Sequence, residues 1–193
     1  MVRSTALNGA RLIAILLAIP VGLIMKQPDL GTSLLITASG FYVLFLAGLS
    51  WKIILGAAVA AASALPLAWN YLLHDYQRQR VLTLIDPASD PLGAGYHIIQ
   101  ATIAVGSGGV AGKGWMAGTQ THLDFLPERS TDFIFAVFSE EFGLIGNLFL
   151  LLLYAAIIWR GLWLAAGAPS LFGRLLSGAI VLTFFTYAFV NMG

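Results

Sequence analysis

The chain has 193 residues, of which 59% are hydrophobic and 10% are charged, with a formal net charge of +1. The mean hydropathy of +0.86 points to a membrane protein, because apolar stretches of about 18 or more residues are best interpreted as membrane-spanning helices. The sequence has no cysteine, which excludes a disulfide framework and a thiolate nucleophile, and no basic block that would indicate a nucleic acid partner.

We predict an all-α integral membrane protein with about five transmembrane helices. The second, third and fifth spans contain no charged residue, and the fourth carries Glu140 and Glu141 about two turns after its start. The predicted spans cover residues of about 6–25, 30–50, 53–73, 133–159 and 175–193.

Basic residues in the short connections predict the orientation. They lie before the uncharged part of the first span (12–25), separate the second from the third, and flank the link between the fourth and fifth: Arg3, Arg11, Lys52, Arg160 and Arg174. Alternation of the spans places all of them on one side, which the positive-inside rule identifies as cytoplasmic. Residues 74–132, between the third and fourth spans, are then one long extracytoplasmic loop, too long for a passive connection.

Two stretches of this outer loop predict helices, and a third is rich in glycine. Residues 74–80 are typical of a polar helix, and residues 96–105 of a short interfacial helix. The glycine-rich run at 106–115 has two open interpretations: backbone N–H groups that cradle a phosphate, or a flexible loop over the membrane surface. It is not a Walker loop, because Lys113 is followed by Gly114 rather than by serine or threonine.

Charge is concentrated where the outer loop meets the fourth span. Six of the charged residues lie between Asp124 and Glu141, and charge at a membrane boundary usually has a function because its desolvation is costly. Asp132 fits two roles, as an N-cap of the span or as a general base beside an anion-binding Arg129. Glu128 lies four residues before Asp132, so the two carboxylates could flank one substrate if the segment is helical.

The other ionisable residues near the spans are less specific. Asp29 is either an N-cap paired with Lys26 or a polar residue lining a cavity that faces the outer loop. Successive helical residues project about 100° apart, so at most one of Glu140 and Glu141 is expected to face a protein interior. That glutamate should have a partner, which could lie on spans absent from this chain. The three histidines are too scattered along the sequence to indicate a metal site.

Several motifs in one order resemble the SEDS family (shape, elongation, division and sporulation). The resemblance is closest to the rod-shape-determining, RodA-like branch and runs across almost the whole chain. The chain resembles a fragment, because it lacks the first spans and the final segment of family members. The motifs that carry the resemblance lie at residues 27–33, 74–80, 86–97, 106–115 and 126–135.

The resemblance implies a peptidoglycan glycosyltransferase that polymerises lipid II during cell elongation. It implies a multi-pass protein of the bacterial inner membrane, with the long loop on the periplasmic side. Its partners would be lipid II, an undecaprenyl-pyrophosphate-linked disaccharide peptide, and a class B penicillin-binding protein that supplies transpeptidation. The family's essential outer-loop aspartate falls on Asp132, and its conserved membrane aspartate falls on Asp29. No cofactor is implied with certainty, and a divalent cation stays open.

Both lines of reasoning lead to one mechanistic hypothesis. Asp132 deprotonates the acceptor hydroxyl in an inverting transfer, Arg129 and Lys113 offset charge on the pyrophosphate leaving group, and Glu128 lies beside the substrate. The alternatives are a lipid II flippase, with Asp29 and the membrane glutamates lining a path, and a non-catalytic scaffold of the elongation complex. The outer clustering of charge favours the transferase, because a flippase needs polar groups through the membrane depth.

Overall fold

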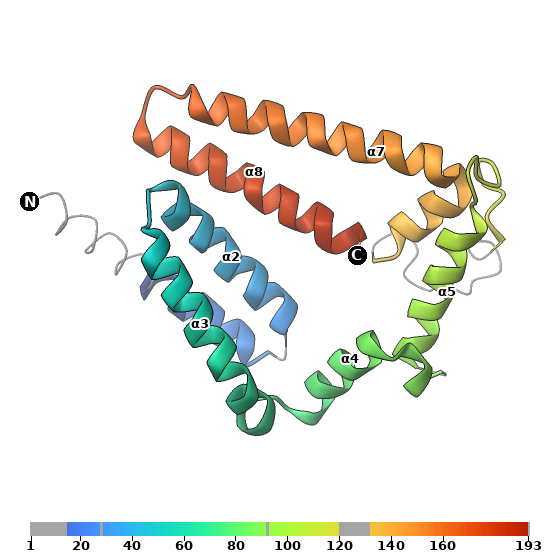
Figure 1. The fold of residues 1–193 in the computed structure, drawn as a ribbon, viewed down its shortest axis with the longest axis horizontal. Coiled ribbons are helices and arrows are strands. Elements are labelled where there is room, and N and C mark those ends of the chain that lie inside the picture. Colours follow the sequence, from blue (N-terminus) through green and yellow to red (C-terminus); the bar gives the residue numbers. More distant parts are fainter. Residues whose placement is uncertain (1–14, 28, 92, 120–131, 193) are drawn as a thin grey trace, which may run out of the picture. The chain divides into compact units, whose positions relative to one another are not determined.

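A computed structural model describes residues 15–27, 29–91, 93–119 and 132–192. Within these ranges every regular element is helical, which confirms the predicted all-α fold (Figure 1). The elements are a helix at Ile15–Met25, α2 (Leu30–Leu46), α3 (Trp51–Leu67), the π-helix η1 (Ala68–Leu72), α4 (Asp75–Ile85), the 3-10 helix η2 (Pro87–Ser89), α5 (Ala94–Ser107), α7 (Ile134–Ala166) and α8 (Leu171–Met192).

Among the described residues, three helices are long and apolar enough to cross a membrane. They cover Trp51–Tyr71, Ile134–Ala166 and Leu171–Met192, and two shorter apolar helices cover Ile15–Met25 and Gly31–Leu46. These helices fall on the five predicted spans. How many of them cross a bilayer, and on which side residues 74–132 lie, stay predictions.

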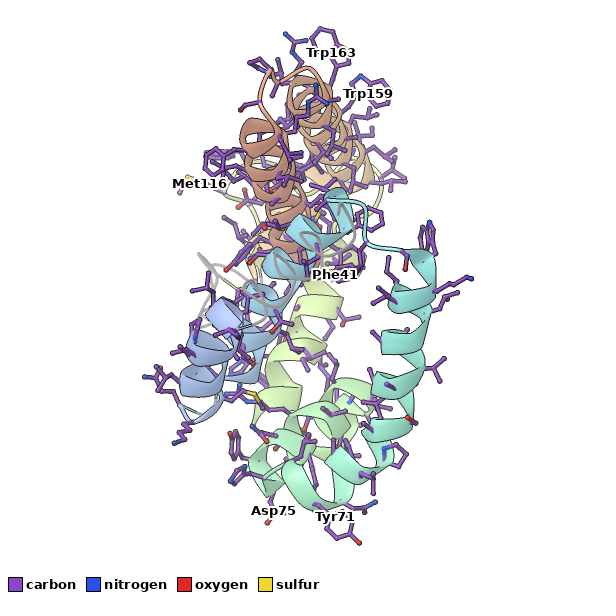
Figure 2. All side chains as sticks on the ribbon, turned by 90° about the vertical axis from the view of Figure 1, so that its left-hand side faces the viewer. Phe41, Tyr71, Asp75, Met116, Trp159 and Trp163 are labelled. Carbon is purple, nitrogen blue, oxygen red and sulfur yellow. The ribbon has the colours of Figure 1, made fainter. Side chains whose placement is uncertain are left out.

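Helix α7 is longer than predicted. It continues past residue 159 to Ala166, because Arg160 does not end it. Arginine is a good helix former, and the guanidinium carbon of Arg160 lies 4.5 Å from the centroid of the Trp163 ring, within cation–π range. Trp159 and Trp163 are both exposed near this end of the helix (Figure 2). A charge flanked by aromatic rings is therefore accommodated within the helix.

The chain forms two compact units, of which the first contains residues 1–51 and 154–190. Small residues line its helix contacts: Gly161 faces Val181, and Gly178 faces Leu46. Such residues let membrane helices approach closely, where van der Waals packing replaces the hydrophobic drive available in water. A hydrogen bond also joins α2 to α8. It is half-buried and links the hydroxyl groups of Tyr42 and Thr186.

The second unit contains residues 52–153 and the last three residues. The predicted polar helix is present as α4, which His74 and Gln77 start as a capping box, with the His74 amide donating to Gln77 Oε1 at 3.0 Å. The helix predicted at 96–105 is present as α5, which packs against η2 and α4. Both helices are confirmed as helices, and a position at the membrane interface stays a prediction.

The hydrogen bond between Tyr42 and Thr186 should be measurable as a coupling between two substitutions. In a double-mutant cycle of Tyr42→Phe and Thr186→Val, we expect a coupling of about 0.6 kcal/mol in the free energy of unfolding, the usual size of such bonds between membrane helices. Unfolding in mixed detergent micelles measures it. Tyr71→Phe is the matched control, because this tyrosine is 81% exposed. Strictly additive single effects would contradict the bond.

Candidate functional site

Helix α7 is broken at Gly143. The backbone angles of this residue are φ 63° and ψ −160°, which are not helical. Positive φ is readily adopted by glycine because it has no Cβ. We call residues 134–142 the short arm and residues 144–166 the long arm of α7, and Figure 1 shows the bend between them. Glu140 and Glu141 both lie at the end of the short arm, directly before the break.

Residues 108–114 cross α7 at this break and supply the hydrogen bonds that the helix has lost. The short arm ends with unsatisfied carbonyl groups and the long arm begins with unsatisfied amides, as at any pair of helix termini. The crossing segment provides a partner for two groups on each side. The bonds are Lys113 N–H to Glu140 O and Gly114 N–H to Glu141 O, both at 3.0 Å, and Leu144 N–H to Gly109 O and Ile145 N–H to Val110 O, at 2.9 and 3.1 Å.

This crossing needs glycine because two backbones touch. Gly112 has φ 78°, and a Cβ there would overlap the carbonyl group of Glu141. A Cβ on Gly143 would overlap the Gly112 amide, and one on Gly108 would overlap the Ser139 carbonyl. The glycine-rich run thus closes a helix break, a role that neither of its two predicted interpretations included. The amides of Lys113 and Gly114 are occupied here and do not point to a free phosphate cradle.

An ion pair between a buried carboxylate and a partly exposed ammonium lies on the same crossing. The Glu140 side chain is fully buried, and its Oε1 lies 2.6 Å from Lys113 Nζ. The same oxygen accepts from the Thr119 amide at 2.9 Å and the Thr119 hydroxyl at 3.0 Å, and lies 3.5 Å from the Ser107 hydroxyl. Lys113 Nζ also donates to the Thr119 hydroxyl at 2.9 Å. We call these four residues the Glu140 cluster. A buried carboxylate requires such donors, since an uncompensated charge in a protein interior is strongly destabilising.

The expectation that at most one of the two adjacent glutamates is buried is wrong. Glu140 is 0% exposed and Glu141 is 8% exposed. The expectation assumes that a helix is covered from one side, whereas the crossing segment bonds to the backbone of both residues. The partner of Glu140 is Lys113, which lies in this chain.

The structure places three of the predicted site residues. Asp132 is exposed in the turn that precedes α7. Asp29 is exposed at the start of α2, where its Oδ1 accepts from the Thr32 amide at 3.0 Å, so it is an N-cap, while its pairing with Lys26 stays a prediction. Lys113 is engaged by Glu140. Glu128 and Arg129 lie outside the described residues.

Asp132 and Lys113 belong to the second unit, and Asp29 belongs to the first. Helix α5 reaches the turn of Asp132, because the His97 ring centroid lies 6.3 Å from that of Phe133. In the part of the chain that the structure describes, no three His, Asp or Glu side chains gather as a metal site would require.

Sequence reasoning missed the Glu140 cluster as a unit. The available signal was a pair of adjacent carboxylates in an apolar stretch of helix, which predicts an opposite charge nearby. It did not indicate which of the basic residues is that partner, because Lys113 and Glu140 are 27 residues apart.

The amino-acid sequence matches the family model described as a cell cycle protein, FtsW/RodA/SpoVE, over residues 1–193. It is similar to the peptidoglycan glycosyltransferase MrdB of Escherichia coli K12, with 57% identity over 188 residues, which are 97% of this chain and 51% of that protein. The probable peptidoglycan glycosyltransferase FtsW of Geobacter metallireducens is 39% identical over 93% of this chain and 47% of its own length. Stage V sporulation protein E of Bacillus subtilis is 36% identical over 89% of this chain and 46% of its own length. The chain therefore spans about half the length of these relatives.

The close contact at Gly112 gives a stability prediction with an internal control. Gly109→Ala introduces only the strain of a side chain at positive φ, about 1–3 kcal/mol, because nothing lies within 4 Å of the new Cβ. Gly112→Ala has the same strain and also overlaps the Glu141 carbonyl, so it should destabilise by a further 1–3 kcal/mol, roughly. Unfolding of both variants in mixed micelles measures the difference. Equal stability of the two would show that the backbones do not touch.

Proposed function

The chain belongs to the SEDS family, the FtsW, RodA and SpoVE cell cycle proteins, and from this membership we propose that it carries the catalytic aspartate of a peptidoglycan glycosyltransferase. The family resemblance seen in the motifs is thereby confirmed, including its RodA-like character. The apolar helices and the relatives together make this a membrane protein with several spans. The two relatives named as glycosyltransferases, MrdB and FtsW, support the activity.

One observation carries the assignment of the base. Asp132 is exposed in the turn from which α7 enters its apolar course, so its carboxylate is open to a substrate. Lipid II has its sugars and pyrophosphate at the membrane surface and its polyprenyl chain in the bilayer. A carboxylate at the end of a membrane helix meets such a substrate at its reacting end.

The proposed step is an inverting glycosyl transfer. The hydroxyl oxygen of the acceptor sugar attacks the anomeric carbon of the donor, while Asp132 takes the hydroxyl proton. The bond from the anomeric carbon to the pyrophosphate oxygen breaks, and the lipid pyrophosphate leaves with the electron pair. Charge develops on that leaving group, so a cation beside it lowers the barrier.

Arg129 is the stronger candidate for this cation, with Glu128 beside the substrate. The Lys113 ammonium is held by Glu140 at 2.6 Å and is only 28% exposed. It would act on a pyrophosphate only after that pair had opened. The role first expected for Lys113 thus requires its ion pair with Glu140 to open, and Arg129 is proposed for the cation on its place in the sequence, three residues before Asp132.

We further propose a membrane location, an orientation and a partner for the chain, and the positions of the basic residues support the orientation. The chain lies in the bacterial inner membrane with residues 74–132 on the periplasmic side, and it works in cell elongation with a class B penicillin-binding protein. The identity to MrdB supports the elongation branch. Asp29 caps α2 and is proposed as a second functional carboxylate at the same membrane face.

Removal of the base should abolish polymerisation while leaving the protein in the membrane. In a full-length family member that carries this segment, Asp132→Asn should lower lipid II polymerisation by about 10²–10⁴-fold, the usual contribution of a positioned base. Gel analysis of labelled polymer measures the yield. Asp75→Asn is the matched control, because it removes another exposed carboxylate of residues 74–132.

Normal polymer yield from Asp132→Asn would remove this residue as the base. Movement of labelled lipid II across liposome bilayers, with no polymer from the unaltered protein, would favour the flippase instead. A scaffold would tolerate Asp132→Asn and still support rod-shaped growth.

A further inference from the structure

We propose that Glu140 is a positioning residue of the transferase: through Lys113 and Thr119 it fixes the crossing segment to the broken helix and so holds the turn of Asp132 in place. This inference rests on the proposed function of Asp132.

The first step concerns what the Glu140 carboxylate connects. It lies on the short arm, while its three donors lie on the segment 107–119, and its Oε1 is within 3.0 Å of donors from both Lys113 and Thr119. The backbone bonds from Lys113 and Gly114 end on the carbonyls of the same two glutamates. Side-chain and backbone contacts therefore both fix the crossing segment to the end of the short arm, and we call this set of contacts the clamp.

The second step concerns the break itself. Gly143 has no side chain to restrict its backbone, so the angle between the two arms is set by what bridges them. The crossing segment is bonded to both arms, through Lys113 and Gly114 on one side and through Gly109 and Val110 on the other. Glu140 is the one described side chain on the short arm that forms a salt bridge with this segment. Loss of the Glu140 contacts therefore allows the angle between the two arms at Gly143, the hinge, to change.

The third step is the size of the effect at Asp132. The short arm is about 13 Å long at 1.5 Å per residue, so a change of about 5° at the hinge moves its far end by about 1 Å. Asp132 lies in the turn at that far end. A misplacement of about 1 Å can lower a rate by about 100-fold. A small change of angle at the hinge, caused by loss of the Glu140 contacts, therefore becomes a displacement of Asp132 that is large enough to lower the rate.

The competing explanation is that Lys113 binds the substrate and Glu140 only holds it ready. The two explanations differ in kinetics. A positioning pair acts as a unit, so removing either member lowers kcat with KM unchanged, and removing both is no worse than removing one. A substrate-binding lysine raises KM when removed, and removal of Glu140 leaves a free lysine that still binds.

The experiment compares Glu140→Gln, Lys113→Met and the double variant in a full-length family member that polymerises lipid II. We expect each of the three to lower kcat by about 100-fold at unchanged KM. Lys113→Arg should restore part of the rate, because it keeps the charge. Lys52→Met is the control for loss of a lysine elsewhere in the chain. Thr119→Val keeps the ion pair and removes one hydroxyl donor, so it should give a smaller loss in a protein that still folds.

Amide hydrogen exchange provides the readout that separates this inference from the assignment of the base. Exchange at Lys113, Gly114, Leu144 and Ile145 should accelerate in the Glu140 and Lys113 variants and stay slow in Asp132→Asn. Faster exchange with an unchanged kcat would overturn the positioning role, and so would a raised KM confined to Lys113→Met. An active Asp132→Asn variant would contradict the assignment of Asp132 as the base. The exchange rates would still show whether Glu140 and Lys113 hold the crossing segment to the short arm.

Discussion

The second unit depends on one constraint, that a helix interrupted in the protein interior must have its freed backbone groups satisfied by another segment. Glu140, Glu141 and Gly143 are buried at the break, and a buried N–H or C=O group without a partner costs free energy comparable to a lost hydrogen bond. At Gly143 the carbonyls of the short arm and the amides of the long arm both receive partners from residues 109–114. The glycine-rich run, the break and the burial of both glutamates are consequences of this arrangement.

The ion pair of Glu140 and Lys113 follows from the same crossing. A carboxylate placed there without a cation would be unstable, because the desolvation of a charge exceeds what a few dipoles return. With the ammonium at 2.6 Å and two donors from Thr119, the site is close to neutral and its acceptor oxygen is saturated. Such a site holds structure rather than binding an anion. It also explains why the lysine of the glycine-rich run does not resemble the exposed cation that a phosphate-binding loop presents.

The parts of the fold that the sequence could predict are those governed by local composition. Uncharged apolar windows located α2, α3 and α8, and the polar stretch after His74 located α4. The break could not be predicted, because an isolated glycine in a helical pattern is usually tolerated without one. The partner of Glu140 could not be predicted either, because it is set by tertiary contact across 27 residues. The role of Asp132 came from the family resemblance, since its spacing suited a cap equally well, whereas Glu128 and Arg129 lie outside the described residues.

The bend at Gly143 also bears on the prediction that α7 crosses a bilayer, because it divides the helix into two shorter lengths. A straight helix of 33 residues would be about 50 Å long, well beyond a hydrocarbon core of about 30 Å. The long arm alone is roughly 35 Å, which fits that core with a modest tilt. The ten residues before Leu144 then need not be accommodated in lipid at all, so the acidic pair adds no hydrophobic mismatch. If the long arm is the fourth predicted span, the length of helix presented to lipid is set by the position of Gly143 rather than by the full length of α7.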